Sequence, residues 1–241
     1  MHPALSRTSP PQILAGPFPS WFAVFAWALG SLNSSRPNMT TLPQLASRQA
    51  DHPIEPLFIQ RWSRRAFTGE PLPDAVLFSV LEAARWAPSG GNSQPWRFVY
   101  SRRGSASWDA FFDLLLPGNQ RWAANASALI LLASQTTRFR DGQRVKASSH
   151  SFDAGAAWAQ LALQAEKLGW STRAIGGFEK EKARLALGVP EDLALEVVIA
   201  LGKPAEALAL PADLQEKEAP NSRLPLSELA FEGRFPQPRA L

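Results

Sequence analysis

The sequence predicts one α+β domain preceded by an irregular N-terminal extension. Helical and strand-like patterns alternate loosely from about residue 55 onward, and two apolar runs have the length of buried strands. The regular part contains no domain linker and no internal repeat. With 241 residues, the chain is long enough for one domain with a sizeable core. We therefore expect residues 1–54 to form an extension and residues 55–241 to form a single domain.

The extension is rich in Pro, Ser and Asn and shows little periodicity. Its apolar stretch, Phe18–Leu32, is too short for a membrane-spanning helix, which needs ~20 apolar residues. A signal-peptide core is a poor match because Arg7 is the only charge before it, and Pro17 and Pro19 interrupt its start. We favour a disordered tail, or a misassigned start with Met39 as the first residue. A cytoplasmic protein without a membrane anchor is therefore expected.

Two helices open the domain. The segment Pro56–Trp62 predicts a short helix that ends at Ser63. In Asp74–Ala87, apolar residues recur at helical spacing, and Pro88 follows the end of the pattern. This second segment predicts an amphipathic helix with one face in the core.

The next segments predict a strand, a helix and a second strand. Trp96–Ser101 alternates between apolar and polar residues as a half-buried strand does. Ser107–Leu116 predicts a helix that Pro117 and Gly118 close. The unbroken apolar run Ala128–Ser134 predicts a strand that is buried on both faces.

The C-terminal half begins with a long helix. Phe152–Leu168 has small residues in its first half, which indicate either a close helix–helix contact or simply high helix propensity, and Gly169 ends it. Glu179–Leu187 predicts another helix, and Leu193–Leu201 predicts a strongly apolar strand. From Pro211 onward the chain is Pro-rich and polar, which predicts an extended arm.

The composition excludes several kinds of chemistry. The chain has no cysteine, which excludes disulfides, thiolate metal sites and Cys nucleophiles. Its three histidines, His2, His52 and His150, lie far apart in sequence, so we expect no metal site and no Ser-His-Asp triad. The G-x-G-x-x-G, P-loop, H-E-x-x-H and G-x-S-x-G motifs are all absent. If the protein is an enzyme, we expect a cofactor to carry the reaction.

The charge distribution argues against nucleic acid. The formal net charge is +4, from 25 basic and 21 acidic residues. However, the basic residues are spread along the chain in runs no longer than the doublets Arg64-Arg65 and Arg102-Arg103. Without a basic stripe we expect no nucleic-acid partner, although a local phosphate-bearing ligand remains open.

Two clusters are candidates for ligand binding. Between Arg61 and Arg65, three arginines and one serine hydroxyl can hold a phosphate through charge-assisted hydrogen bonds, although a solvated basic turn is an alternative. The loop Ala87–Trp96 has two glycines that permit close backbone approach, together with polar side chains that can hydrogen-bond a ligand. An ordinary helix–strand loop is the alternative there.

Taken together, the two clusters resemble the FMN-dependent nitroreductase family, in the patterns R-x-S-x-R-x-F and A-P-S-x-x-N-x-Q-P-W. The resemblance covers roughly residues 55–230 and continues downstream in the same order. Each motif alone is weakly specific, but their common order is a strong signal. The further segments are Asn119–Trp122, Asp153–Gly155, Ile175–Phe178, Gly188–Pro190, Leu201–Pro204 and Asn221–Pro225.

The resemblance implies a fold and a set of phosphate contacts. The expected fold is an α/β/α sandwich with a mostly antiparallel central sheet, in an intertwined homodimer. Arg61, Trp62 and Ser63 match positions that hold the FMN phosphate and ribityl chain, and Arg223 matches a second phosphate contact. Arg65 matches a cationic position near flavin N1, where positive charge stabilises the anionic reduced ring.

The resemblance also implies contacts to the flavin ring. Ser89, Gly90 and Asn92 match a loop that reaches the FMN bound by the neighbouring subunit. Gly176 and Gly177 match a stretch whose backbone N–H points at flavin N5. No side chain of the protein is expected to act as a catalytic acid or base.

One further position matches the family, and two positions depart from it. Asn119 matches a residue at the ring edge. Some relatives have a lysine where Trp122 stands, and another where Asn221 stands. Both replacements should weaken contacts to phosphate or to an anionic substrate unless Arg121 or Lys203 compensates.

The implied function is a two-step hydride transfer. NADH or NADPH would deliver a hydride to flavin N5, and a nitroaromatic, quinone or related small molecule would then be reduced at the same face. Relatives of this architecture also reduce enals, remove halogens or fragment the flavin itself. A flavin-binding protein used for storage or regulation is the alternative outside enzymes.

Overall fold

The computed structural model describes residues 48–236. The apolar stretch Phe18–Leu32, Met39 and most of the extension expected over residues 1–54 lie outside this range. Within it, no helix is both long and apolar enough to cross a membrane.

A four-stranded antiparallel sheet forms the centre of the domain, in the order β1-β2-β6-β5. The strands β2 and β6 occupy its middle, and both are almost entirely apolar because helices cover both of their faces. In register, Ile130 of β2 lies between Tyr100 of β1 and Ile199 of β6. The strand bounds are β1 Trp96–Arg102, β2 Ala128–Gln135, β5 Ser171–Ile175 and β6 Leu193–Gly202.

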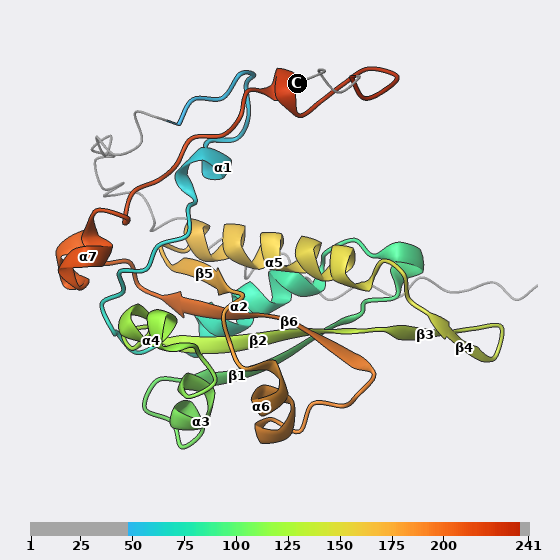
Figure 1. Cartoon of the computed structure of the whole chain (residues 1–241), viewed down its shortest axis with the longest axis horizontal. Helices are drawn as coiled ribbons and strands as arrows, with labels where there is room; N and C mark the ends of the chain where they lie inside the picture. Colours follow the sequence, from blue (N-terminus) through green and yellow to red (C-terminus); the bar gives the residue numbers. More distant parts are fainter. Residues whose placement is uncertain (1–47, 237–241) are drawn as a thin grey trace, which may run out of the picture. The chain divides into compact units, whose positions relative to one another are not determined.

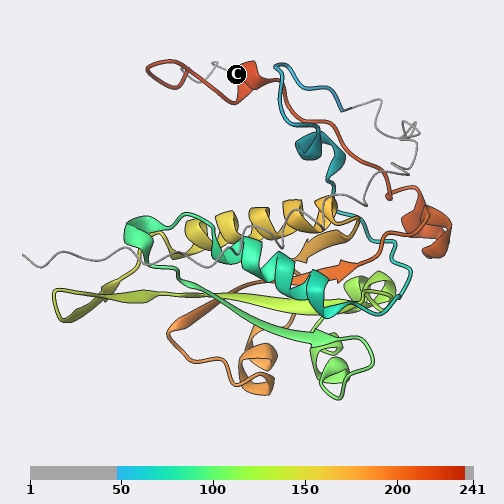
Figure 2. The ribbon, with the colours of Figure 1, turned by 180° about the vertical axis from the view of Figure 1, so that it is seen from behind.

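Helices pack on both faces of this sheet (Figures 1 and 2). The helices α2 and α5 lie on one face, and α3 and α6 lie on the other. Alternate residues of β2 point to opposite sides, so that Ile130 and Leu132 join one core cluster while Leu129 and Leu131 join the other. The predicted α+β class and antiparallel α/β/α layering are therefore confirmed. The helix bounds are α1 Pro56–Gln60, α2 Asp74–Arg85, α3 Trp108–Phe112, α4 Pro117–Ala123, α5 His150–Lys167, α6 Lys180–Ala186 and α7 Ala212–Gln215.

One predicted helix is shorter than expected, and a second helix begins at the proline that was expected to close it. The sequence predicted a helix over Ser107–Leu116 that Pro117 would close, whereas α3 ends at Phe112 and a new helix, α4, begins at Pro117. Proline suits the first helical position because its missing N–H is not needed there and its φ is already helical. The helix α1 likewise ends earlier than predicted, at Gln60 rather than Trp62.

Three strands were not predicted. The hairpin of β3 (Thr137–Arg140) and β4 (Gln143–Lys146) extends beyond the central sheet (Figure 1). Its turn residues Asp141 and Gly142 have φ values of 53° and 77°, the positive values that tight hairpin turns favour in Asp-Gly pairs. The Asp141-Gly142 dipeptide is therefore a sequence feature from which the hairpin could have been predicted. The third strand, β5, is short and partly polar, so its sequence shows no clear strand pattern. It is a strand because it pairs with β6.

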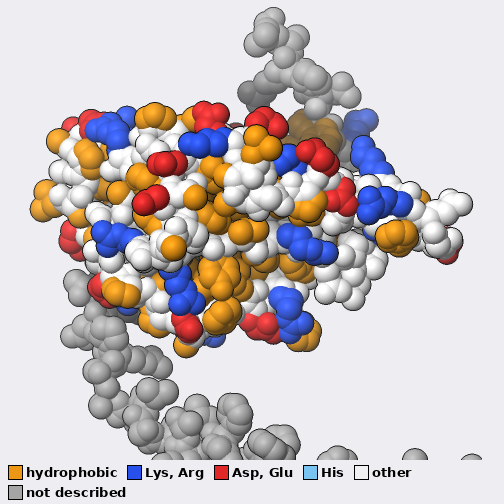
Figure 3. Space-filling model, turned by 90° about the horizontal axis from the view of Figure 1, so that it is seen from below, with side chains coloured by type: hydrophobic (Ala, Val, Ile, Leu, Met, Phe, Trp, Pro, Cys, Tyr) orange, Lys and Arg blue, Asp and Glu red, His pale blue; other side chains and the backbone are white. Residues whose placement is uncertain are grey.

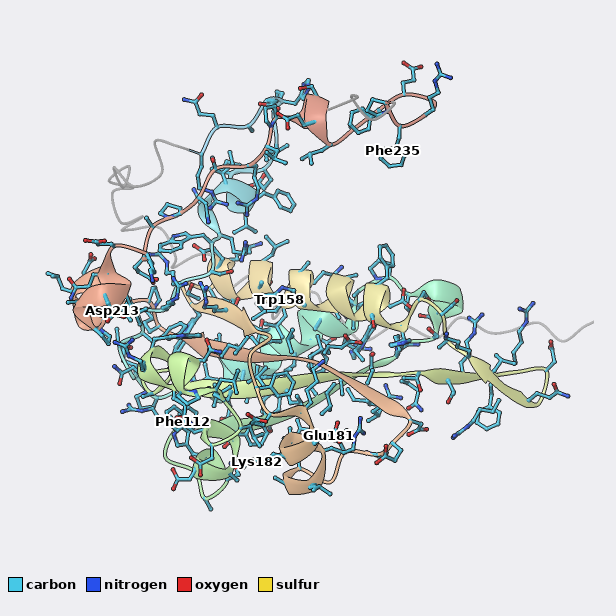
Figure 4. The ribbon with its side chains drawn as sticks, in the orientation of Figure 1. Phe112, Trp158, Glu181, Lys182, Asp213 and Phe235 are labelled. Atoms are coloured by element: carbon cyan, nitrogen blue, oxygen red, sulfur yellow. The ribbon has the colours of Figure 1, made fainter. Side chains whose placement is uncertain are left out.

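The two terminal segments of the described chain lie against each other. The backbone N–H of Leu226 donates to the Asp51 carboxylate over 2.7 Å. The predicted arm after Pro211 contains the short helix α7 before it extends. Figure 4 shows Asp213 on α7 and Phe235 near the end of this arm, where 82% of the Phe235 side chain is exposed.

Figure 3 shows the surface from below, on the side of α3 and α6. Basic and acidic side chains are interspersed there among apolar ones. This face therefore carries charge of both signs rather than one continuous basic surface.

Candidate functional site

A small pocket opens where the segment after α1 meets β5 and the C-terminal arm. Its volume is about 200 Å³. We call it the cationic pocket because four arginines and one lysine line it, while no carboxylate among the described residues does. It brings together the four residues that the resemblance assigned to the FMN phosphate and ribityl chain, and Arg65, which the resemblance assigned to the flavin N1 region. The lining residues are Arg61, Trp62, Ser63, Arg65, Arg173, Lys217, Ala219, Asn221 and Arg223.

Local contacts fix the Arg61–Ser63 part of this pocket. The N–H of Arg61 donates to the Leu57 carbonyl at the end of α1 over 3.0 Å. The Arg61 guanidinium lies 3.4 Å from the Ser63 hydroxyl, to which it donates. Arg173 of β5 donates to the Ser63 carbonyl from the other side. The turn after α1 is therefore tied to the edge strand of the sheet.

A buried carboxylate holds the next part of the segment. Glu218 accepts the backbone N–H of Arg65 at 2.6 Å and that of Ala66 at 2.9 Å. Its second oxygen lies 3.5 Å from the Arg65 guanidinium. Glu218 is only 6% exposed. This residue therefore joins the C-terminal arm to the Arg65 end of the pocket, although it does not line it.

Burial, with a smaller effect of neighbouring cations, lowers the pKa of two arginines of this pocket. Burial, and secondarily the neighbouring Arg223, lowers the pKa of Arg61 despite the opposing effect of Glu166. Burial and the Arg65 charge lower the pKa of Arg173. Both guanidiniums thus keep their charge at a cost that a bound anion would offset.

A second group of predicted residues meets at the end of β5. The Asn119 side-chain amide donates to the Gly177 carbonyl over 2.9 Å, and Trp122 Nε1 donates to Asn119 Oδ1 over 3.3 Å. Among the described residues, the backbone N–H groups of Gly176 and Gly177 donate to no other protein group. These N–H groups are therefore available to a ligand, as the sequence prediction requires.

The two groups are connected through β5. The Arg173 guanidinium lies 5.6 Å from the centre of the Trp122 ring, within cation–π distance. Because Arg173 also contacts Ser63, β5 links the cationic pocket to the Asn119–Gly177 contact. An elongated ligand with a phosphate at one end could contact both groups.

The predicted loop with Ser89, Gly90 and Asn92 lies elsewhere, at the start of α5. The Gly90 N–H donates to the buried Asp153 carboxylate over 3.2 Å, and the Ser89 hydroxyl accepts the Gln94 N–H over 3.0 Å. Asn92 has a φ of 53°, an uncommon value that favours Asn over most other side chains. Local contacts therefore hold the loop in a defined conformation.

The length of α5 separates this loop from the cationic pocket. Asp153 contacts the loop near the start of the helix, whereas Glu166, near its end, interacts with Arg61 and Arg64. Thirteen residues of helix between Asp153 and Glu166 correspond to ~20 Å. The structure thus places the predicted site residues in two regions: the cationic pocket with the linked Asn119–Gly177 contact, and the separate loop at the start of α5.

Sequence reasoning missed three residues at the cationic pocket. The sequence offered only a weak indication that Arg173 belongs to the site. It is a charged residue in a short segment that contains β-branched residues and precedes Gly176. For Lys217 and Glu218 the sequence offered no indication, because the run Gln215–Glu218 resembles a solvated helix end. They reach the site only because the C-terminal arm folds back onto the segment after α1.

The model of the nitroreductase family matches residues 59–117 and 102–203. A relative named NADH dehydrogenase, from Thermus thermophilus, is 29% identical over 217 residues, which are 79% of this chain and 98% of the relative.

Solved structures match over most of the same region. One described as an oxidoreductase containing FMN is 45% identical with a TM-score of 0.77, covering 78% of this chain and 96% of that one. A protein from Desulfovibrio desulfuricans, solved in complex with FMN, is 28% identical with a TM-score of 0.59, covering 78% of this chain and 100% of that one.

Proposed function

The chain belongs to the nitroreductase family, and from that membership we propose that it is an FMN-dependent oxidoreductase that passes electrons from NADH or NADPH to a small acceptor. The names of its relatives support this proposal, since one is an oxidoreductase containing FMN and another an NADH dehydrogenase. Nitroaromatics and quinones are the acceptor classes that we propose first.

The cationic pocket carries the proposal. Arg61, Arg65 and Arg223, together with Arg173 and Lys217, surround a space of about 200 Å³ without a carboxylate in its described lining. So many cations in one small pocket repel each other unless an anion is present. A phosphate group fits this requirement because its oxygens accept several charge-assisted hydrogen bonds at once.

The other group of residues fits the flavin ring. Asn119 is oriented by its bonds to Gly177 and Trp122, and the Gly176 and Gly177 N–H groups are available to a polar ring atom. Bound FMN would supply the redox chemistry, accepting a hydride from the reduced nucleotide and returning two electrons to the acceptor. The chain's own residues would bind, orient and electrostatically stabilise the cofactor.

We propose that the active protein is a homodimer. One cofactor held in the cationic pocket cannot also contact Ser89, Gly90 and Asn92 of the same chain, because about 20 Å of α5 lies between them. A second copy would bring its own loop to that cofactor. Exposed apolar residues are available for such an interface, among them Phe152 on α5 at 82% exposure.

Visible absorption spectra test the proposal. Protein reconstituted with FMN is mixed anaerobically with NADPH or NADH, and a quinone or nitroaromatic is then added. Loss of the flavin bands and their return with the acceptor is the expected result. Flavin bands that neither nucleotide bleaches would instead favour storage, and irreversible loss of the bands would favour an enzyme that consumes FMN.

A further inference from the structure

A second pocket, larger than the cationic pocket, lies apart from it. Its volume is about 880 Å³, within the range of small-molecule and cofactor sites. It lies between the loop that contains Gly91 and Asn92 and the β3–β4 hairpin. We call it the hairpin pocket. Four arginines line it, and Asp192 is the one carboxylate in its described lining.

Two of the four arginines in the hairpin pocket have an acidic neighbour. Arg140 lies 3.8 Å from Asp141, and Arg144 lies 3.4 Å from Asp192, which also accepts from Gln135 over 2.6 Å. Arg97 and Arg138 donate only to backbone carbonyls within the described chain. The pocket therefore has an excess of positive charge that an anionic ligand would neutralise.

An exposed aromatic ring lies among these cations. Phe139 of β3 lines the pocket with 73% of its side chain exposed, and the Arg144 guanidinium lies 5.8 Å from its ring centre. An exposed phenylalanine offers a stacking surface for a planar base. Arginines beside it offer charge-assisted hydrogen bonds to phosphates. The combination matches an adenosine phosphate better than a simple inorganic anion.

We infer that the hairpin pocket binds the phosphate-bearing adenosine half of the reductant, and that this chain prefers NADPH to NADH. The inference rests on the proposed function, in which Asn92 of one protomer contacts the cofactor of its partner. Gly91 and Asn92 line the hairpin pocket, so a dinucleotide bound there would extend toward that cofactor. The 2′-phosphate of NADPH adds negative charge where the arginines are in excess.

Binding of 2′,5′-ADP, measured by calorimetry, tests the inference without any redox reaction. The double variant Arg140→Gln/Arg144→Gln removes two charges whose side chains are 71% and 57% exposed, so the fold should persist. We expect its Kd for 2′,5′-ADP to rise by about tenfold or more, as two charge-assisted contacts are lost. The control Arg85→Gln removes one positive charge on α2, at a residue outside the pocket lining, and should leave the Kd unchanged.

Three outcomes would overturn the inference. They are unchanged 2′,5′-ADP binding in the double variant, an equal loss in the Arg85 control, and equal wild-type kcat/KM for NADPH and NADH. In the double variant, a raised KM for the anionic acceptor 4-nitrobenzoate with unchanged 2′,5′-ADP binding would assign the pocket to the acceptor.

N-benzyl-1,4-dihydronicotinamide is a hydride donor that lacks phosphates, so its reaction with the flavin tests the proposed function independently of the hairpin pocket. If neither it nor NADPH reduces the wild-type flavin, the proposed function fails whatever 2′,5′-ADP does.

Discussion

The Arg173 guanidinium lies 5.6 Å from the centre of the Trp122 ring. The family resemblance matches Trp122 to a position that holds a lysine in some relatives. Arg173 of β5 reaches this ring and also lines the cationic pocket. The structure thus places a cation beside the position at which the resemblance implied the loss of one.

Replacement of Arg173 by Ala should weaken FMN binding about 10- to 100-fold, the effect of losing a charged hydrogen bond worth ~1.5–3 kcal/mol. Quenching of flavin fluorescence during titration of the apoprotein measures this Kd. Arg173→Lys keeps the charge and should retain most of the affinity. Equal Kd values for the wild type and Arg173→Ala would remove Arg173 from the proposed site.

Replacement of Arg61 or Arg223 by Ala should lower FMN occupancy after purification without unfolding the chain. Within residues 48–236, the exposed Arg223 donates only to the carbonyls of Asn221 and Ser222, at 3.4 and 2.9 Å, so its replacement should change stability by no more than about 0.5 kcal/mol. The absorbance ratio of flavin to protein reports occupancy. Arg234→Ala, in the same arm, is the matched control. Full occupancy in both variants would refute the site assignment.

Replacement of Glu218 by Ala should destabilise the protein. It leaves the Arg65 and Ala66 N–H groups without their acceptor, at a cost of about 1–3 kcal/mol for each buried group that stays unpaired. Urea unfolding of the apoprotein measures the change. Glu218→Gln retains an acceptor oxygen and should lose less. If the two variants are equally stable, the backbone contacts do not hold this segment.

Replacement of Gly177 by Ala should slow flavin reduction more than it weakens FMN binding. The added Cβ would lie 2.8 Å from Asn119 Nδ2, so the Asn119 side chain would have to move away from the Gly177 carbonyl. Misplacement by about 1 Å near reacting atoms costs up to ~100-fold in rate. Stopped-flow reduction by NADPH gives the rate, and the FMN titration gives the affinity. An unchanged rate would place Gly177 away from the reacting ring.

Stability should depend on pH through Glu166. Burial raises the pKa of this carboxyl above its ordinary value of 4.5, although Arg64, Arg61 and Arg48 oppose the shift. The folded chain therefore keeps this proton at pH values where the unfolded chain has lost it. The contribution of Glu166 to stability is then largest at low pH and declines as the pH rises through the raised pKa.

Glu166→Gln should accordingly be more stable than the wild type at pH 8, and the difference should shrink as the pH falls toward 4.5. Urea unfolding of the apoprotein across this range measures the difference. A wild type that is the more stable form at pH 8 would show that attraction to the three arginines outweighs the cost of burial.

The sequence by itself determined those helices and strands whose spacing of apolar residues shows which of their residues are buried. The helix α2 places Leu77, Val80 and Ala84 in the core at the predicted spacing, and β2 is as fully buried as its apolar run indicated. Periodicity succeeds there because one element's residues alone show which side faces the core. The family resemblance was confirmed for the same reason, since its motifs are short and contiguous.

Only the tertiary structure decided which distant residues meet. Glu218 holds the N–H of Arg65 across 153 residues of sequence, and Arg173 reaches Ser63 because β5 forms the edge of the sheet. No local pattern encodes either contact. Likewise, the length of α5 places the Gly90 loop about 20 Å from the arginines that the sequence had grouped with it. These separations follow from strand order and helix length, which long-range packing sets.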